Sequence, residues 1–352
     1  MRTYIMSLLI MLSLKSFAQI GISENLDIKF LAEILNQNRI VGLGEDSHGY
    51  KNSSEIKVAL IKELKQEYGF NTVIFESSFC NNWAANNWNL EPLDDMKSRI
   101  YKVWNTAELL DLFEYAQASD MKFFGCDIKG QTGYRSTMFE ERMAEQISKV
   151  DLKLETTFYN LEERTAVYRE MFSLKKREVA QRDSVDALID KYEILSGQVK
   201  LSSRLDSTTK SWVLACLDNR KSLLRLVKIE YGNFEKVTFR DAMMSSNLQW
   251  LLNGPFRDEK VIVWAADSHL AKKRYFDTMI ALLPDSIKSN MYSMAIKPKR
   301  KANAKIKKTM KNIKAQDYFF VDQTAKYFPE KYHGAYDGII FCEKWEKSRL
   351  IE

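Results

Sequence analysis

The strongest constraint on the fold is a series of short apolar segments, each bounded by polar or turn-forming residues. Six of them occur, at 40–43, 72–75, 122–125, 261–264, 318–321 and 338–341. Continuous apolar runs of this length are typical of strands buried on both faces, as in parallel sheets covered by helices. Apolar spacing predicts intervening helices near 24–38, with Ser23 as cap, near 55–68, with Ser53 or Ser54 as cap, and near 107–118, preceded by Thr106. This alternation predicts an α/β fold with a mostly parallel central sheet flanked by helices.

The middle of the chain has a different composition. Neither glycine nor proline occurs from Tyr134 to Ser196, and the stretch is rich in Glu, Lys, Arg and Leu. We therefore predict an all-helical insertion at 135–234, between two parts of an α/β core at 19–134 and 235–352. Two interpretations of the insertion are open, a structural arm or a wall over a cleft at the sheet.

The N-terminus has the features of a secretory signal at residues 1–18. Arg2 precedes an apolar run from Tyr4 to Leu14, and small residues at Ser16 and Ala18 favour a cut after Ala18. The run is too short for a membrane span, although an uncleaved anchor is an alternative. We therefore expect a periplasmic or secreted protein. Its charge would be (53 − 2) − 47 = +4, since the signal holds two basic residues, and this does not indicate nucleic-acid binding.

The four cysteines give no sign of a metal or redox motif. Cys80, Cys126, Cys216 and Cys342 are far apart and lack C-x-x-C spacing. Three of them lie in or just after apolar segments, where cysteine usually behaves as a small hydrophobic residue. We expect buried thiols, and the sequence does not pair them.

Ionisable residues follow four of the predicted strands. They are Glu45 and His48 after 40–43, Glu76 after 72–75, Asp127 after 122–125, and Asp267 and His269 after 261–264. In parallel sheets, ligands bind beyond the carboxyl ends of the strands. Turns alone do not require so many ionisable groups, so we expect these residues to form a site at one edge of the sheet.

The segment GLGEDSHG at 42–49 concentrates glycines, carboxylates and a histidine. A dinucleotide fingerprint would need a third glycine where the chain has Ser47, and no Walker lysine follows. The carboxylates of Glu45 and Asp46 would also repel a phosphate. The G-x-S-x-G motif of a serine hydrolase is absent as well. We expect the glycines to allow a sharp turn that delivers Glu45 and His48 into a cleft.

Two chemistries remain open from the residues alone. Glu45, His48, Glu76, Asp127 and His269 could hold a divalent metal such as zinc, manganese or iron, which bind histidine and carboxylate ligands. Alternatively, His48 acts as a general base on water, with a cation to stabilise the oxyanion that forms. Arg240, at the start of a predicted helix, is a suitable cation.

Separated blocks of the sequence resemble the erythromycin esterase family. GLGEDSHG resembles the family's G-E-x-x-H-G loop, and YGFNTVIFES resembles its next strand, which ends in a glutamate. VWNTAELLDLFEYAQ and KFFGCDIKG resemble its W-x-T-x-E helix and the strand after it. RDAMMSSNLQWLL resembles the helix R-D-x-x-M-x-x-N-x-x-W-L, KVIVWAADSHLAK the strand end W-A-H-N-x-H, and YDGIIFCEKWEKSR the last strand. The blocks follow the family's order and span most of the chain after the signal.

The resemblance implies an α/β core with a helical domain over a cleft, and hydrolysis of an ester, since studied members cleave the lactone of macrolides. It implies that Glu45 and His48 lie in the catalytic loop, with Glu76, Arg240 and His269 in the same cleft. The chain departs from the family at W-A-H-N-x-H, where Ala266 replaces the first histidine and Asp267 the asparagine. A different ester, slow turnover or loss of hydrolysis would each fit that departure.

These observations predict an exported hydrolase that cleaves a small-molecule carboxylic ester without metal or covalent intermediate. His48 would take a proton from water, oriented by Glu45 or Glu76, and Arg240 with protonated His269 would stabilise the oxyanion. The candidate substrate-binding residues are Trp83, Trp104, Asp127 and Asp267.

Two other classes stay open. One is a metal-dependent hydrolase that uses the same carboxylates and histidines. The other is a periplasmic protein that binds haem, metal or a small molecule without turnover, which Ala266 and the family's resemblance to haem-binding exported proteins suggest. No nucleic-acid partner is expected, and the sequence does not set the oligomeric state.

Overall fold

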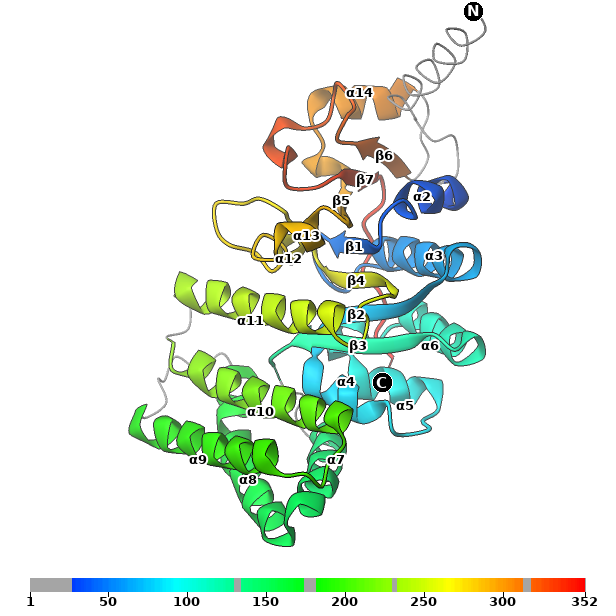
Figure 1. The fold of residues 1–352 in the computed structure, drawn as a ribbon. Helices are drawn as coiled ribbons and strands as arrows, with labels where there is room; N and C mark the ends of the chain where they lie inside the picture. The colour runs from blue at the N-terminus through cyan, green and yellow to red at the C-terminus, as the bar shows by residue number, and fades with distance from the viewer. Residues whose placement is uncertain (1–26, 130–133, 174–181, 230–232, 313–317, 352) are drawn as a thin grey trace, which may run out of the picture.

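The computed structural model describes residues 27–129, 134–173, 182–229, 233–312 and 318–351. The expected signal at 1–18, and Ser23 as a helix cap, lie outside these residues. Within them the chain forms one seven-stranded sheet, with the order β3-β2-β4-β1-β5-β7-β6 (Figure 1). The strands are β1 (Ile40–Glu45), β2 (Phe70–Ser78), β3 (Lys122–Asp127), β4 (Lys260–Ala266), β5 (Met291–Pro298), β6 (Tyr318–Asp322) and β7 (Gly338–Cys342).

The predicted, mostly parallel sheet is confirmed, with one added strand and one antiparallel pair. Every neighbouring pair is parallel except β6 with β7, which are antiparallel. Strand β5 was missed by the sequence analysis, although it pairs with both β1 and β7. Its sequence, MYSMAIKP, interrupts the apolar run with Ser293 and Lys297, and both side chains are buried in the fold.

Alternate side chains of each central strand pack into two different hydrophobic cores, one on each face of the sheet. Val41 and Leu43 of β1 pack on one face of the sheet, whereas Ile40 packs on the other. In β4, Ile262 and Trp264 join the first core, and Val261, Val263 and Ala265 the second. The apolar runs lack alternation because both faces of the sheet are covered.

The first face is covered by α2 (Ile28–Leu35), α3 (Lys51–Tyr68), α5 (Pro92–Arg99) and α6 (Ala107–Ser119). The predicted helix at 55–68 begins earlier, at Lys51, and its N-cap is Tyr50 rather than Ser53 or Ser54. It ends as expected before Gly69, whose φ of 75° suits the left-handed cap of a helix. The helix at 107–118 is confirmed with one more residue.

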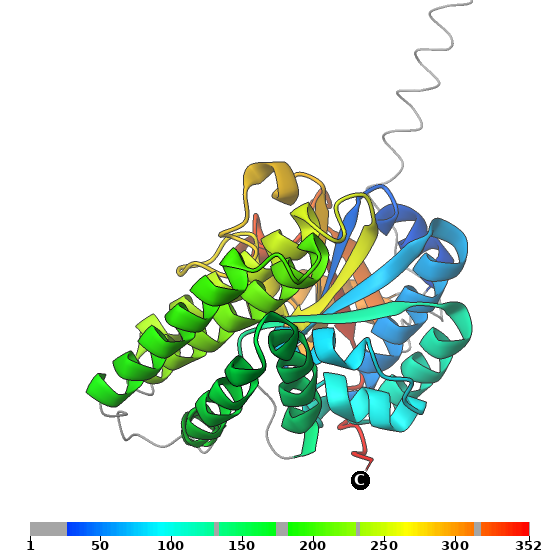
Figure 2. The same cartoon turned by 60° about the horizontal axis from the view of Figure 1, so that its bottom comes forward.

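The middle of the chain is helical, as predicted. It forms α7 (Tyr134–Val150), α8 (Leu152–Ser173), α9 (Arg182–Leu201) and α10 (Ser207–Val227). Figures 1 and 2 show these helices beyond the β3 edge of the sheet, beside α11 (Phe234–Asn253). They share one apolar core with α4 (Phe79–Ala85), α11 and the second face of the sheet. The helical region is therefore packed directly on the α/β part.

The remaining elements complete the second face and the β6 edge of the sheet. They are the short helices α12 (Asp267–Leu270) and α13 (Asp285–Lys288), and α14 (Ala304–Asn312). Among the described helices, none has the length and apolarity that a membrane crossing needs. All four cysteines are buried free thiols, as expected.

Candidate active site

The four strands followed by ionisable residues are neighbours in the sheet. Their order is β3-β2-β4-β1, and all four run parallel, so their carboxyl ends meet at one edge. Glu45 ends β1, Asp127 ends β3, and Ala266 ends β4 directly before α12. Glu76 lies near the end of β2. The sheet thus gathers residues separated by more than two hundred positions in sequence.

A dyad of Glu45 and His48 occupies the end of β1. The Nδ1 of His48 lies 2.7 Å from Oε1 of Glu45, and the indole Nε1 of Trp104 donates to the same oxygen at 3.1 Å. The other oxygen of Glu45 accepts from Nζ of Lys57, a fully buried lysine on α3 whose ammonium also lies over the ring of Trp264. Glu45 is therefore fixed by three donors.

His48 has the geometry of a general base. An ionised carboxylate only accepts hydrogen bonds, so Nδ1 carries the hydrogen and Nε2 of the neutral ring is left to accept a proton. Burial lowers the pKa of His48, and the positive charges of His269, Arg240 and Lys129 lower it further against the opposing effect of Glu76. The side chain is 33% exposed, so a water molecule can reach it.

The glycines of the segment 42–49 serve a different purpose from the one expected. Gly42 and Gly44 lie inside β1, where the expected sharp turn does not occur. A Cβ on Gly44 would lie 2.7 Å from the Cα of Asp267, so glycine lets α12 pack against the strand. Only Gly49 of the three has a positive φ, at 72°. The chain therefore bends after Glu45, at residues 46–49, rather than at Gly42 or Gly44.

The C-terminal segment holds the loop that follows His48. Ser348 N–H donates to the carbonyl of Gly49, and Lys51 N–H donates to the carbonyl of Glu346. The ring of Trp345 stacks on that of Tyr50, with 4.9 Å between the centroids. These contacts restrain the backbone that carries His48.

Arg240 links two of the predicted carboxylates. It projects from α11, its Nη2 donates to Glu76 at 2.8 Å and to Asp127 at 2.6 Å, and its Nε donates to Asp127 at 3.1 Å. Asp127 also accepts from the hydroxyl of Tyr101 at 2.8 Å. Burial alone would lower the pKa of Arg240, but Asp127 and Glu76 outweigh it and hold the pKa well above its usual value.

His269 lies between two carboxylates and is held as an imidazolium. Its Nδ1 contacts Asp241, and its Nε2 lies 3.2 Å from Oε1 of Glu76. Burial by itself would lower the pKa, but the charge of Glu76 and the hydrogen bonds to Asp241 and Glu76 raise the pKa of His269 to about 9. The sequence analysis expected this residue to be protonated.

The site brings like charges together and balances them. Nη1 of Arg240 lies only 3.4 Å from Nε2 of His269, and Glu76, Asp127 and Asp241 surround the two cations. Burial alone would raise the pKa of Glu76, but His269 and Arg240 hold it well below its usual value. Burial, together with Arg240, lowers the pKa of Lys129 beside the site to about 8. This edge of the sheet is therefore suited to stabilising developing negative charge.

The other predicted substrate-binding residues have structural partners. Trp104 contacts the ring of His48 edge-on, with 4.8 Å between the centroids, as well as bonding Glu45. Asp267 is buried in an ion pair with Lys297, which also lies 3.3 Å from Asp46. Trp83 is buried against Trp212 in the core of the helical region. Trp104 thus supports the dyad, while Asp267 and Trp83 contact groups outside it.

The side chains that could bind a metal already have other partners. Glu76 already accepts from Arg240 and from the backbone N–H of Ala266, and Asp127 accepts from Arg240. Both ring nitrogens of His269 face carboxylates. Within the described ranges, no three or more His, Cys, Asp or Glu side chains group as a metal site would require. A metal here would have to displace the guanidinium.

Sequence reasoning missed three residues that support the site: Lys57, Asp241 and Tyr101. Lys57 lies on one face of α3 with Ile61 and Leu64, at positions i, i+4 and i+7, and all three are fully buried. A lysine within an apolar stripe is a signal that could have been used, since buried lysines require a partner. Asp241 directly follows Arg240, which the sequence placed at the start of a helix, although α11 begins six residues earlier at Phe234.

We expect the variant Asp241→Asn to lower the pKa of His269 from about 9 towards its ordinary value of 6.5, because the asparagine removes one of the two negative charges that stabilise the imidazolium. The imidazole ¹⁵N shifts of the three histidines, followed over pH and assigned with His48→Ala and His333→Ala, measure this directly. Asp285→Asn, at a 98% exposed side chain, should leave the titration unchanged. A His269 pKa that stays near 9 in Asp241→Asn would contradict the assignment.

The sequence of this chain is similar to those of known proteins of one family. The family model described as erythromycin esterase matches residues 66–282, a stretch that includes Glu76, Asp127, Arg240 and His269 and begins after Glu45 and His48. The Bacillus subtilis protein named "Putative hydrolase YbfO" is 26% identical over 305 residues, which cover 78% of this chain and 68% of that protein. Erythromycin esterase type II of Escherichia coli is 24% identical over 286 residues, or 73% and 67% of the two chains.

Solved structures agree in fold. A crystal structure of a Bacillus cereus protein superposes with a TM-score of 0.74 at 16% identity and covers 93% of each chain. A mutant of the erythromycin esterase EreC in its open conformation superposes with a TM-score of 0.67 at 13% identity, covering 92% of this chain and 95% of that one. The family model spans most of the chain, and the chain therefore belongs to the erythromycin esterase family.

Proposed function

We propose that the protein is an exported hydrolase that cleaves a small-molecule carboxylic ester with water activated by His48. The observation that carries the proposal is the pairing of a neutral, partly exposed histidine with a buried glutamate, beside a second histidine held as a cation. Family membership supports a hydrolase, and the geometry of these side chains supports the mechanism.

The reaction begins at Nε2 of His48. This nitrogen takes a proton from water as the water oxygen attacks the ester carbonyl carbon, and Glu45 stabilises the imidazolium that forms. The tetrahedral intermediate then collapses by breaking the bond to the alcohol oxygen. The departing alkoxide takes the proton from His48, so the products are the carboxylic acid and the alcohol. No bond between protein and substrate is formed.

The oxyanion of the intermediate would lie near Arg240 and His269. Nε and Nη2 of Arg240 are committed to Glu76 and Asp127, so the Nη1 group that faces His269 is its available donor. These cations are already in place before reaction, and fixed charges of this kind lower the barrier without reorganisation. Removal of one such donor typically costs about 10²–10³-fold in kcat.

Ala266 bears on which ester is cleaved. The family pattern has a histidine here, whereas in this chain the backbone N–H of Ala266 donates to Glu76 at 2.9 Å. In the sheet, Ala266 is the register partner of Glu45, so an imidazole at 266 would adjoin the dyad. We propose that the methyl group leaves room for an ester group whose shape differs from a macrolide lactone.

Export is part of the same proposal and rests on residues 1–18. Cleavage after Ala18 would give a mature chain that begins at Gln19. The intact mass of protein recovered from the periplasm or the medium tests it. A mass that retains residues 1–18 would contradict cleavage.

We expect the purified mature protein to hydrolyse members of a panel of aryl, alkyl and lactone esters, with a rate plateau between two pH limits. The rate should fall below pH 6.5, because His48 must be unprotonated and its pKa is lowered, and it should fall above about pH 9, because His269 must be protonated. A pH-stat or chromogenic assay of kcat/KM against pH measures both limits.

Added chelator should leave this rate unchanged. Loss of activity that one divalent metal restores would instead favour the metal-dependent mechanism on the same residues. A ligand that copurifies, with no turnover of any ester, would favour a binding protein. A macrolide lactone and its linear ester analogue in the same panel test the role proposed for Ala266.

A further inference from the structure

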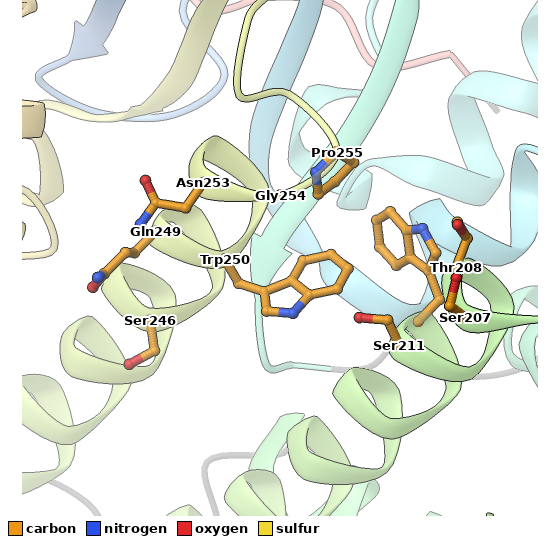
Figure 3. Close-up of a pocket in the computed structure, with 10 residues that line it drawn as sticks. Ser207, Thr208, Ser211, Ser246, Gln249, Trp250, Asn253, Gly254 and Pro255 are labelled. Carbon is orange, nitrogen blue, oxygen red and sulfur yellow. The ribbon is translucent and has the colours of Figure 1, made fainter. Parts of the chain in front are cut away.

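We propose that the protein has a second binding site, for a neutral saccharide, in a groove between α10 and α11. The groove has a volume of about 750 Å³, within the range of small-ligand sites. Two helix faces line it, with Gly254 and Pro255 at one end. Figure 3 shows the indole of Trp250 extending from α11 towards α10, in the direction of Ser211.

The lining residues occupy one face of each helix. On α11, Ser246, Gln249, Trp250 and Asn253 follow the i, i+3, i+4, i+7 spacing of a single stripe. On α10, Ser207, Thr208, Ser211 and Trp212 likewise cluster over one and a half turns.

The groove is separate from the candidate active site. Ser246, Gln249 and Asn253 lie six, nine and thirteen residues after Arg240, which places the groove roughly 9 to 20 Å further along the α11 axis. At about 100° per residue, the groove stripe also points away from the side of α11 that carries Arg240. A ligand in the groove would therefore not touch the groups that perform the proposed hydrolysis.

The chemistry of the lining favours a neutral, hydroxyl-rich ligand. None of the ten lining residues is charged, although charged residues make up 28% of the chain. An ionic ligand would thus have no counter-charge in the groove. The amides of Gln249 and Asn253 and the hydroxyls of Ser207, Thr208 and Ser211 border it and can both donate and accept hydrogen bonds.

The two indoles that line the groove are packed against other aromatic rings. Trp212 and Trp250 meet edge-to-face with 4.6 Å between ring centroids, and Trp212 also stacks on Phe124 at 5.8 Å and on Trp83 at 6.2 Å. Trp250 is only partly buried and lies over this cluster. A pre-ordered indole offers apolar area at little entropic cost, and the C–H face of a pyranose ring is the complementary surface. Hydroxyls at the ring edge would then meet the amides and serines.

The test is a titration of the full chain with three neutral hexasaccharides, namely cellohexaose, laminarihexaose and maltohexaose, followed by tryptophan fluorescence and calorimetry. We expect saturable binding of at least one of them, weakened about tenfold or more in Trp250→Ala, as for other central aromatic contacts. The variant Trp88→Ala removes an indole that is 44% exposed and lies outside the groove, and it should bind like the wild type.

Two further variants keep the result interpretable. The double variant Gln249→Ala and Asn253→Ala retains the indole and should also weaken binding. Weakened binding in this variant would show that the effect of Trp250→Ala does not come from a disturbed fold. His48→Ala should bind with unchanged affinity, since the groove does not depend on the proposed hydrolysis. Binding that is lost in His48→Ala would place the saccharide in the other site and overturn the proposal.

Two further ligands test whether the groove requires a neutral sugar ring. An oligogalacturonate hexamer should not bind, because its carboxylates would have no counter-charge in the groove. The detergent hexaethylene glycol monododecyl ether, which has no sugar ring, should bind no better than the best saccharide. Failure of all three hexasaccharides, or retention of binding in both the Trp250 and the double variant, would overturn the site.

Discussion

The variant His48→Ala is expected to lose about 10²–10⁴-fold in kcat/KM for ester hydrolysis, the usual contribution of a general base, while remaining folded. The fold should survive because the side chain is 33% exposed and because Glu45 keeps its bonds to Lys57 and Trp104. Because the variant leaves Glu45 with hydrogen-bond partners, we expect it to lower the rate of hydrolysis and not the stability of the fold. Steady-state kinetics and a thermal unfolding curve together separate the two effects.

The chain offers a matched control for this variant. His333 is exposed, and its ring lies beside that of Phe328, with 5.0 Å between the centroids. His333→Ala should hydrolyse esters at the rate of the wild type. Equal rates for His48→Ala and the wild type would disprove the proposed role of His48 and leave the fold and family assignment intact.

The variant Arg240→Met is expected to lose both stability and activity, because it removes the cation shared by two buried carboxylates. Breaking a buried ion pair by removing one partner typically costs about 3–5 kcal/mol, since the remaining charge is left in a poorly solvated position. Glu76 and Asp127 are both nearly inaccessible to solvent. Urea unfolding at constant pH measures the loss in free energy of unfolding.

The loss of stability in Arg240→Met should depend on pH. The pKa of Glu76 in the folded wild type lies well below its ordinary value of 4.5, so its ion pairs stabilise the fold above that value and the stabilisation is lost as the pH falls through the lowered pKa. In Arg240→Met the pKa should rise. The difference in stability between the two proteins should then be largest near pH 7 and should shrink near pH 4.

Two further arginines separate stability from chemistry. Arg220→Met breaks another buried pair, with Glu162 at 2.8 Å in the helical region, and should destabilise the protein while leaving kcat/KM per folded molecule unchanged. Arg257→Met, at an exposed position, should change neither. Full activity in Arg240→Met would remove Arg240 from the proposed mechanism, and unchanged stability would contradict the pairing seen in the structure.

The sequence was sufficient where short-range patterns dominate. Apolar runs and caps predicted six of the seven strands and the parallel α/β arrangement, because burial of both sheet faces imposes an unbroken apolar run. Strand β5 escaped, since Ser293 and Lys297 break its apolar run and are satisfied by partners far away in sequence: Ser293 donates to the carbonyl of Leu270, and Lys297 pairs with Asp46 and Asp267. The strand-end rule likewise selected Glu45, Glu76, Asp127 and His269 without any contact being known.

The sequence by itself therefore determined the class of fold, the family resemblance and the edge of the sheet where chemistry is expected. The tertiary structure decided which charges meet. Arg240 joins Glu76 to Asp127. Asp241 and Glu76 hold His269 as a cation, and Lys57 donates a hydrogen bond to Glu45. Hydrophobic periodicity is set by near neighbours along the chain and is visible in the sequence. Ion pairing depends on distances of a few ångströms between distant segments, and those distances exist only once the sheet has brought its strand ends together.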